Sequence, residues 1–483
     1  MTPTRPGAPR VETGDPGATR VPGSFRDPGG FVFTRDGALY RQVNAAFAPE
    51  FDACTAAGLY DALGRDQLLI AHHPADPALA LTPDAHAVLA PERVPFVSYP
   101  YEWSFGQLRD AALLTLDVQA RALELGFTLR DASAYNVQFA GGRPVFIDTL
   151  SFARYTSGEP WAAYKQFCEH FLAPLALVAH RDARCGLALR DHLDGIPLDL
   201  ASALLPRRTW AGPGTLLHVH LHARAQRRHH DTDVAATIGA RPLPKHALLA
   251  LVRSLRRTVE RLRWHPAGTA WADYATTTNY SSTAQQAKHT LVDRYLRRVH
   301  PRTVWDLGAN TGHYSRVAAA IAPLVCALDA DPAAVERNYQ TTRARGETAL
   351  LPLVVDLSNP SPAAGWANRE RASLAERGPA DAVLALALVH HLAIGHNVPL
   401  DRVAAYLATL GRTLVVEFVA KSDSQVRRLL RNRPDVFPAY TREGFERAFA
   451  AHYRIETHER VGDADRWLYL MTARPPGPTR ATA

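Results

Sequence analysis

The chain has 483 residues and a mass of 52.9 kDa, which is long enough for two or more domains of ordinary size. Its 47% hydrophobic and 21% charged residues exclude disorder over the whole length, because a disordered chain lacks the apolar residues that build a core. The formal charge of +8 does not predict a nucleic-acid partner, since almost all basic residues are arginine, a bias typical of nucleotide composition.

Neither a membrane nor an oxidising compartment is indicated. The longest apolar runs fall far short of the ~18–20 residues that span a bilayer, and residues 1–23 lack the apolar stretch of a secretion signal. The 4 cysteines are scattered, without a close pair or the spacing of a zinc site. We therefore expect a cytoplasmic protein without a membrane partner and without a bound metal.

The N-terminal region is predicted to begin with strands. Residues 1–28 are rich in Pro, Gly, Thr and Arg, which predicts a disordered tail. Apolar residues at 31–33 and 39–43 flank Asp36 and Gly37, a pattern typical of a β-hairpin. Further helices and short strands are expected at residues 47–62, 108–125, 136–139 and 144–147.

From residue 161 to about residue 262 the pattern is mostly helical, with Pro-rich turns. Residues 248–262 predict a basic amphipathic helix, because Leu251, Leu255 and Val259 recur at helical spacing. We interpret it as a helix packed by its apolar face, and a membrane-surface or partner helix is the alternative. One domain is therefore expected over residues 29–265.

After residue 265, short apolar strands alternate with helices. This β-α-β alternation predicts an α/β fold with a parallel, doubly wound, Rossmann-like sheet over residues 266–474. Residues 475–483 are expected to form a second tail. The predicted strands are 303–307, 325–328, 351–355, 382–388 and 413–418, and the predicted helices are 314–321 and 333–345.

The first of these strands leads into a loop that contains glycine. Asp306 ends the strand, Gly308 and Gly312 lie in the loop, and a helix follows directly. Glycine permits a sharp turn and a close approach to a ligand, and the helix N-terminus presents free N–H groups. The Asp-x-Gly-x-x-x-Gly spacing differs from that of dinucleotide-binding folds. A purely architectural loop is the alternative.

Acidic residues follow the next two strands. Asp329 lies at the carboxyl end of the second strand, where a carboxylate accepts hydrogen bonds from ribose hydroxyls. Asp331 is interpreted as the N-cap of the next helix, because Pro332 stands at the first helical position. Asp356 ends the third strand in the same way.

With these three motifs in register, residues 271–474 resemble the class I S-adenosylmethionine-dependent methyltransferases. In that family the glycine loop holds the methionine part of the cofactor, the acidic residue after the second strand binds the ribose, and a carboxylate after the third strand contacts the adenine. The resemblance therefore implies S-adenosylmethionine as the cofactor. The binding residues that it implies are Asp306, Gly308, Asn310, Gly312, Asp329 and Asp356.

Candidate catalytic residues lie at the ends of the fourth and fifth strands. In the family that the sequence resembles, the fourth strand ends facing the transferring methyl group, and His390 and His391 stand there. A neutral imidazole accepts a proton from an O–H or N–H group. The alternative is that His390 packs under the cofactor and that His391 caps the strand or points to solvent. Glu417 is a candidate for orienting the substrate, and Tyr280 is a candidate lid residue.

The wider pattern of the C-terminal part resembles the NoeA-like nodulation-protein methyltransferases. The segments that carry this resemblance are residues 356–362, 365–366, 389–392, 417–423 and 429–433. The resemblance implies a methyltransferase with a poorly defined acceptor, which we expect to be a small molecule or a glycan.

A second group of polar residues lies in the N-terminal part. Asp131 and Asn136 form an Asp-x-x-x-x-Asn pattern that is followed by Asp148. Phosphotransferases of the kinase-like fold use this order for the proton acceptor and the two metal ligands. Residues 96–152 thus resemble aminoglycoside- or lipopolysaccharide-kinase-like C-lobes. The first strands contain no lysine for the phosphates, so Arg41 would have to supply that charge, and we expect a degenerate α+β kinase-like domain.

A run of histidines offers a metal site as one interpretation. The alternation of His218, His220 and His222 would place them on one face of a strand, followed by His229 and His230. No carboxylate or cysteine shares this spacing, and the nearby arginines would repel a cation. A role without metal is therefore preferred.

The sequence as a whole predicts a kinase-like domain followed by a methyltransferase domain. The expected reaction transfers a methyl group from S-adenosylmethionine to an O, N or S nucleophile. Two alternatives stay open: a bifunctional enzyme whose N-terminal domain is an ATP-dependent phosphotransferase, and a non-catalytic regulator that binds S-adenosylmethionine.

Overall fold

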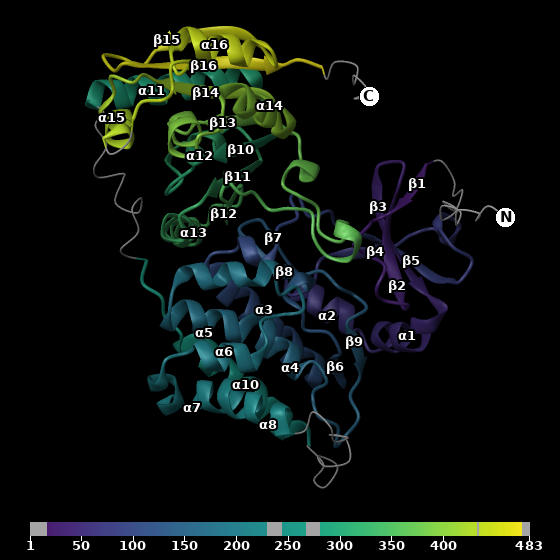
Figure 1. The fold of residues 1–483 in the computed structure, drawn as a ribbon. Helices are drawn as coiled ribbons and strands as arrows, with labels where there is room; N and C mark the ends of the chain where they lie inside the picture. The colour runs from purple at the N-terminus through teal and green to yellow at the C-terminus, as the bar shows by residue number, and fades with distance from the viewer. Residues whose placement is uncertain (1–16, 229–243, 267–280, 432–433, 476–483) are drawn as a thin grey trace, which may run out of the picture.

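The computed structural model describes residues 17–228, 244–266, 281–431 and 434–475. In these ranges, an N-terminal half runs from β1 to α10 and a C-terminal half runs from α11 to β16 (Figure 1). Of the helices described, none combines the length and the apolar character needed to cross a membrane.

The N-terminal half begins with an antiparallel sheet in the order β1-β2-β3-β5-β4. Its central hairpin is confirmed, and Asp36 and Gly37 have φ of 51° and 79°, as a two-residue hairpin turn requires. The disordered tail predicted for residues 1–28 is wrong from Gly17 onward, because β1 pairs with β2. The strands are β1 (Ala18–Arg20), β2 (Gly30–Arg35), β3 (Ala38–Asn44), β4 (His72–Pro74) and β5 (Ala85–Pro91).

Two helices replace the single helix predicted for residues 47–62. These are α1 (Ala48–Ala56) and α2 (Leu59–Arg65). Gly58 lies between them with φ of +67°, in the left-handed region, and this ends the first helix. The apolar pattern continues across the break, which explains why the sequence predicted one helix.

The rest of the N-terminal half is built around α3 (Phe105–Glu124), which Ser104 and Gln107 cap at its N-terminus. The apolar face of α10 (Lys245–Arg261), with Leu248, Val252 and Leu255 buried, packs on α3, so it is covered by protein. This confirms the preferred interpretation of the basic helix. The remaining helices are α4 (Tyr164–Phe167), α5 (Ala173–His180), α6 (Leu198–Leu204), α7 (Pro213–Thr215) and α8 (His222–Arg228), and the short strands are β6 (Phe127–Leu129), β7 (Val137–Ala140), β8 (Arg143–Phe146) and β9 (Phe152–Arg154).

The C-terminal half contains a seven-stranded sheet in the order β12-β11-β10-β13-β14-β16-β15. The five strands from β10 to β14 are parallel, which confirms the doubly wound α/β fold, whereas β16 runs antiparallel to β14 and β15. The antiparallel hairpin was not predicted. The strands are β10 (Thr303–Leu307), β11 (Leu324–Asp329), β12 (Leu350–Val354), β13 (Ala380–Ala385), β14 (Gly411–Val419), β15 (Tyr453–Arg460) and β16 (Arg466–Ala473).

Helices cover both faces of this sheet, and the alternation along β10 shows how. Val304 packs with the helices α11 and α12, whereas Trp305 and Leu307 pack on the opposite side with α13 and α14. Asp306 points to the first side, because side chains alternate along a strand. The helices are α11 (Ser282–Val299), α12 (His313–Ala319), α13 (Pro332–Arg345), α14 (Leu400–Leu410), α15 (Ser424–Leu430) and α16 (Arg442–Ala450).

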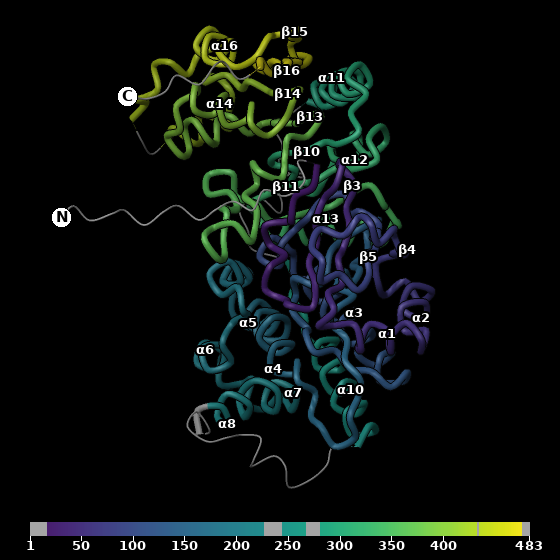
Figure 2. Tube along the Cα trace, turned by 90° about the vertical axis from the view of Figure 1, so that its right-hand side faces the viewer, coloured from purple at the N-terminus to yellow at the C-terminus, as the bar shows by residue number. Residues whose placement is uncertain are grey.

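The two halves meet along α13 and the β12 edge of the sheet, which Figure 1 labels, and Figure 2 shows α13 at the same junction from the side. One hydrophobic cluster continues across the junction, with the rings of Phe96 and Trp305 edge to face at 5.6 Å. Glu102 is 1% exposed and accepts two hydrogen bonds, at 2.5 and 2.8 Å, from Arg377, whose guanidinium lies 5.0 Å from the centre of the Phe96 ring. Ser361 donates a third bond to Glu102 at 2.5 Å. A buried ion pair therefore joins the halves.

Replacement of Glu102 by Ala should destabilise the full chain by about 3–5 kcal/mol, because the Arg377 guanidinium would stay buried without its partner. Asp293→Ala is the matched control, since it breaks the exposed Asp293–Arg297 pair on α11 and should cost less than ~1 kcal/mol. Urea denaturation measures both free energies of unfolding. Equal losses in the two variants would contradict a stabilising role for the buried pair.

Candidate functional site

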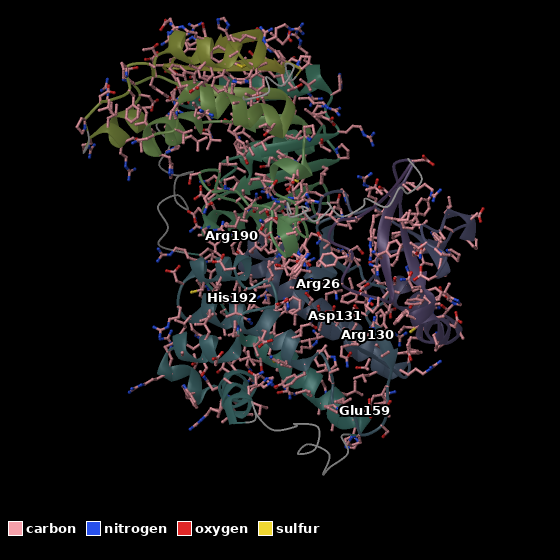
Figure 3. All side chains as sticks on the ribbon, turned by 45° about the vertical axis from the view of Figure 1, so that its right-hand side comes forward. Arg26, Arg130, Asp131, Glu159, Arg190 and His192 are labelled. Carbon is pink, nitrogen blue, oxygen red and sulfur yellow. The ribbon has the colours of Figure 1, made fainter. Side chains whose placement is uncertain are left out.

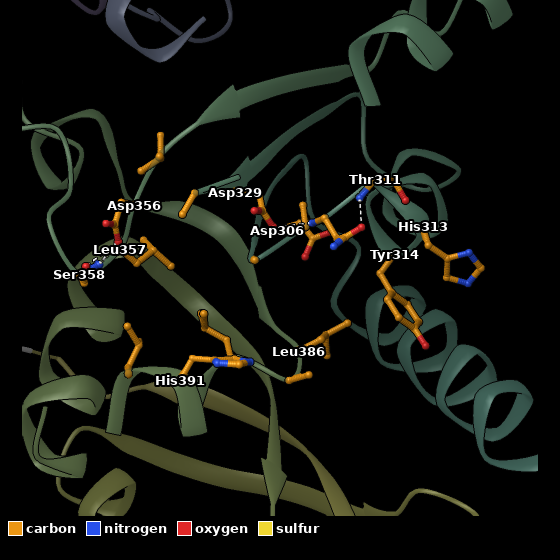
Figure 4. A pocket seen from close by; sticks show the side chains of 18 of the residues that line it. Asp306, Thr311, His313, Tyr314, Asp329, Asp356, Leu357, Ser358, Leu386 and His391 are labelled. Carbon is orange, nitrogen blue, oxygen red and sulfur yellow. Dashed lines mark hydrogen bonds between the residues drawn. The ribbon is translucent and has the colours of Figure 1, made fainter. Parts of the chain in front are cut away.

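A cavity of about 440 Å³ opens at the carboxyl ends of β10 to β13 (Figure 4). Its volume suits a small organic molecule, for which pockets of ~300–1,000 Å³ are usual. The sheet order reverses between β10 and β13, and such switch points are where open parallel sheets bind ligands. The loops that follow the four strands provide most of the lining.

The loop between β10 and α12 turns sharply where it lines this cavity. Gly308, Asn310 and Gly312 all have positive φ, at 77°, 50° and 81°. Gly308 and Asn310 line the cavity, but Gly312 does not. A Cβ at Gly312 would come within 2.5 Å of the Asn338 side chain, so this glycine is required by packing between α12 and α13.

Asp306 lines the cavity at the end of β10 and is 2% exposed. Its carboxylate accepts a hydrogen bond of 2.6 Å from the Ser315 hydroxyl of α12. Burial raises the pKa of Asp306 to about 6, and the Ser315 bond acts in the opposite direction. The carboxyl is therefore mostly ionised at pH 7.5 and loses its charge in mildly acidic solution.

Asp329 lines the same cavity at the end of β11. It accepts hydrogen bonds from the backbone N–H groups of Asn310 at 2.7 Å and Asp331 at 2.8 Å. Burial raises the pKa of Asp329 to about 6, although these bonds favour the charged form. Asp331 caps α13 by accepting from the Ala333 N–H, which confirms its predicted role.

Asp356 lies two residues beyond the end of β12 and also lines the cavity. Its side chain is exposed and accepts bonds from the N–H and the hydroxyl of Ser358, at 2.8 and 2.7 Å. Three of the carboxylates singled out in the sequence thus follow one another along the cavity, each at the end of a different strand.

The two adjacent histidines separate in the structure. His391 lines the cavity, whereas His390 is 1% exposed and does not. Burial lowers the pKa of His391 to about 4 and lowers the pKa of His390 well below its usual value, so both rings are uncharged at neutral pH. Their ring centres lie 4.2 Å apart, so His390 packs behind His391.

Glu417 is fully buried and does not line the cavity. It accepts a hydrogen bond of 2.6 Å from the ammonium of Lys288, which does line the cavity. Glu417 thus stands behind Lys288 in this structure and does not face the cavity as a substrate-orienting residue would. Tyr280, the predicted lid residue, lies outside the described residues.

Several cavity residues were not among the site residues predicted from the sequence. Lys288 and Gln285 come from α11, and Tyr314 comes from α12. An unusual lysine in an arginine-rich chain was the available signal for Lys288. Ala387, also in the lining, has φ of 50°, a strained conformation for a residue other than glycine that is often found at functional sites.

The second predicted group of residues also comes together. Ser151 connects two of its members, because it accepts from Asn136 at 3.2 Å and donates to Asp148. Arg41 from β3 forms an ion pair with Asp148. Burial alone would raise the pKa of Asp148, but Arg41 together with the hydrogen bonds from Ser151 and the Leu150 N–H outweighs burial and lowers the pKa. Asp148, the predicted metal ligand, is thus paired with a guanidinium in this structure.

This region lies close to the junction of the two halves. Arg26 forms hydrogen bonds of 2.5 and 3.0 Å with Glu370 of the C-terminal half. The neighbouring Asp27 accepts a bond of 2.8 Å from Arg130, which precedes Asp131 (Figure 3). Residues from the loop before β2 therefore contact both halves.

The histidine run does not form a strand. Residues 216–221 form a π-helix and α8 follows, so His218 and His220 point to different neighbours. His218 bonds to the hydroxyls of Tyr164 and Ser254, and His220 bonds to those of Ser202 and Thr209. The metal interpretation placed these histidines on one face of a strand, and that geometry is wrong because the segment is helical. The partners of both rings are hydroxyl groups. His229 and His230 lie outside the described residues.

The chain was compared with solved structures. It is 13% identical to the N-methyltransferase NodS from Bradyrhizobium japonicum WM9, over 40% of this chain and 99% of that chain, with a TM-score of 0.30. It is 15% identical to magnesium protoporphyrin IX methyltransferase ChlM from Synechocystis PCC 6803 with bound SAH, over 41% of this chain and 89% of that chain, with a TM-score of 0.30. It is 16% identical to the bifunctional kinase-methyltransferase WbdD, over 44% of this chain and 45% of that chain, with a TM-score of 0.29. At such scores the fold assignment rests on the strand order.

No protein-family model matches the chain. Among curated proteins, nodulation protein NoeA from Rhizobium meliloti (strain 1021) is 38% identical over 463 residues, which are 94% of this chain and 96% of the relative. The predicted resemblance to NoeA-like proteins is confirmed. With this identity over almost the full length of both chains, the protein belongs to the family of nodulation protein NoeA.

Proposed function

We propose that the protein is a class I S-adenosylmethionine-dependent methyltransferase. The observation that carries this proposal is the row of Asp306, Asp329 and Asp356 along one cavity. Hydrogen-bond acceptors spaced in this way suit an elongated ligand that has donors along its length, such as a nucleoside joined to an amino acid. The switch-point position of the cavity supports the same ligand class.

The residues present fit the cofactor at each of its parts. Asp329, held by two backbone N–H groups, is ionised at neutral pH and suits the ribose hydroxyls. Asp356 and Leu357 follow β12 and suit the adenine. Gly308 lines the cavity without a Cβ, which allows a ligand to approach the backbone closely.

The chain contributes mainly alignment of the acceptor with the cofactor. When bound, S-adenosylmethionine supplies an electrophilic methyl group on its sulfonium sulfur. His391 lines the cavity, and its pKa of about 4 makes it a weak base. We therefore assign it a hydrogen bond with the O–H or N–H of the acceptor, with His390 packed behind it. The acceptor is a small molecule or a glycan.

For the N-terminal half we propose a kinase-like fold that does not transfer phosphate. The ion pair between Arg41 and Asp148 supports this, because a cationic side chain already neutralises the proposed metal ligand. In this proposal the N-terminal half, over residues 29–265, recognises or presents the acceptor. The bifunctional alternative requires that Arg41 leaves Asp148 when a nucleotide binds.

Asp329→Ala should weaken binding of S-adenosylmethionine about 10- to 100-fold, since it removes charge-assisted hydrogen bonds to the ribose. Isothermal titration of the purified full chain measures the affinity. Asp401→Ala, which removes an exposed carboxylate on α14, is the control and should bind as the unmodified protein does. Unchanged affinity in Asp329→Ala would remove Asp329 from the site.

Cofactor binding should weaken as the pH falls through about 6. The pKa values of Asp306 and Asp329 are both raised to about 6, so both carboxylates are charged at pH 7.5 and largely protonated at pH 5. A protonated carboxyl is a poorer acceptor, and we expect about a tenfold loss between these two pH values. Titrations with S-adenosylhomocysteine between pH 5 and 8 measure the profile. A flat profile would contradict the role of the two carboxylates.

Titration with ATP and magnesium should show no binding to the unmodified protein, because Arg41 is paired with Asp148. An Asp148→Ala variant should give the same result and should keep its affinity for S-adenosylmethionine. Magnesium-dependent ATP binding that is lost in Asp148→Ala would favour the bifunctional enzyme instead.

A further inference from the structure

Large apolar side chains gather on one exposed face of the N-terminal half. Of the ten that are exposed in the described part of the chain, five lie between residues 200 and 221, and each of these is between 37% and 49% exposed. Single apolar residues on a surface need no explanation, but a group of them usually marks an interaction site. We call this group the leucine face, and it consists of Leu200, Leu204, Trp210, Leu217 and Leu221.

The core does not require these side chains. Helix α6 buries Leu198, whereas Leu200 and Leu204, which are one turn apart, form a second apolar face on the same short helix. The two leucines that the π-helix η8 (Leu216–Leu221) adds to the leucine face are also four residues apart, and η8 contacts α6. A helix at the surface of a domain usually carries polar residues on the side away from the core. The exposed leucines therefore suit a second apolar environment.

Trp210 connects the segments that form the leucine face. Its ring stacks on the ring of His220 with the centres 4.3 Å apart, and His220 forms a hydrogen bond of 2.8 Å with the Ser202 hydroxyl of α6. The Arg224 guanidinium of α8 lies 5.8 Å from the centre of the Trp210 ring. Figures 1 and 2 both show α6 and α8 far below β10 and β11, so a partner on this face leaves the cavity open.

The charge around the leucine face has one sign. Residues 200–230 contain no aspartate or glutamate, and their arginines are Arg207, Arg208, Arg224, Arg227 and Arg228. The first three are exposed in the structure. The Arg208 guanidinium donates to a backbone carbonyl, that of His180, at 3.1 Å. An apolar face with an arginine rim is therefore complementary to a surface that is apolar inside and anionic outside.

We propose that the leucine face binds the surface of a membrane that contains anionic lipids. Its leucines and Trp210 enter the boundary between headgroups and acyl chains, and Arg207, Arg208 and Arg224 contact the anionic headgroups. Leucine and tryptophan beside arginine is the composition of segments that lie in this boundary. The residues that dominate protein–protein interfaces are instead poor in leucine, which favours lipid over an acidic protein.

The absence of a membrane partner was expected from the length of the apolar runs. Run length tests only for a helix that crosses the bilayer, and binding to the lipid surface requires no such helix. The amphipathic character here is also divided between α6, η7 (Arg207–Ala211) and η8, so it becomes visible only in the folded chain. This binding does not depend on the methyl-transfer reaction.

The first experiment mixes the purified full chain with vesicles and measures the fraction that sediments with them. One set of vesicles is phosphatidylcholine alone, and the other is phosphatidylcholine mixed with the anionic phosphatidylglycerol. The anionic set should bind about 100-fold more tightly, because each of three arginines at an anionic surface contributes roughly fivefold, and added salt should weaken the binding. Equal binding to both sets, or binding to neither, would overturn the proposal.

The second experiment replaces apolar members of the leucine face. Leu217→Gln/Leu221→Gln should weaken binding to the anionic vesicles about 10- to 30-fold, since two leucines no longer leave water for lipid. Trp366→Gln/Val436→Gln is the control, because it replaces side chains that are 71% and 63% exposed in the C-terminal half, and it should bind as the unmodified chain does. Both variants change surface residues and should unfold at the urea concentration of the unmodified chain. Equal losses of binding would remove the leucine face from the contact.

The third experiment replaces charges in matched pairs. Arg207→Gln/Arg208→Gln should weaken binding to the anionic vesicles at least about tenfold. Arg427→Gln/Arg428→Gln removes two exposed arginines of α15 and should leave the affinity unchanged. The same affinity in both pairs would contradict the contact between the arginine rim and the headgroups.

Sedimentation velocity without lipid tests whether a second copy of the chain covers the leucine face instead. Membrane binding predicts the same particle size for the unmodified chain and for Leu217→Gln/Leu221→Gln. A larger assembly that is lost in this variant would overturn the proposal and assign the leucine face to contact between copies.

Discussion

The contact on which the rest of the site depends is the attachment of the glycine loop to the neighbouring strand. The N–H groups of Gly308 and Ala309 both donate to the Leu328 carbonyl, at 2.8 and 3.0 Å, and the next N–H, of Asn310, donates to Asp329. These bonds fix the loop at the end of two adjacent strands at once. They also hold the Asp329 side chain at the cavity wall, so loop geometry and ligand chemistry are set by the same atoms.

The sequence predicted those parts of the fold that depend on local pattern. Runs of apolar residues followed by Asp306, Asp329 and Asp356 gave β10, β11 and β12 and the edge at which their side chains meet. To predict that these carboxylates meet, one needs only the rule that the carboxyl ends of parallel strands lie at the same edge of a sheet. The helix cap at Asp331 is equally local.

What the sequence did not predict depends on pairs that are far apart in the chain. Lys288 and Glu417 are separated by 129 residues, and no local pattern indicates that they form a buried ion pair. The hairpin of β15 and β16 was missed for a similar reason, because β16 is defined by its pairing with β14. The alternating histidines show how a short pattern can mislead. His218 and His220 have the period of a strand, but the segment is helical, as the wider pattern of residues 161–262 predicted, and both rings bond to hydroxyl groups.

The continuous hydrophobic cluster between the halves bears on where the chain can be divided. The composition changes near residue 265, and a fragment that begins there contains every described residue of the cavity. Such a fragment would carry Trp305 and Tyr339 without Phe96 and Phe139, which their rings contact, and Arg377 without its carboxylate. In this chain the boundary seen along the sequence thus runs through a continuous hydrophobic cluster. An isolated C-terminal half would expose to water the apolar surface that the N-terminal half covers. Its solubility and self-association would then depend on that surface more than on its cavity.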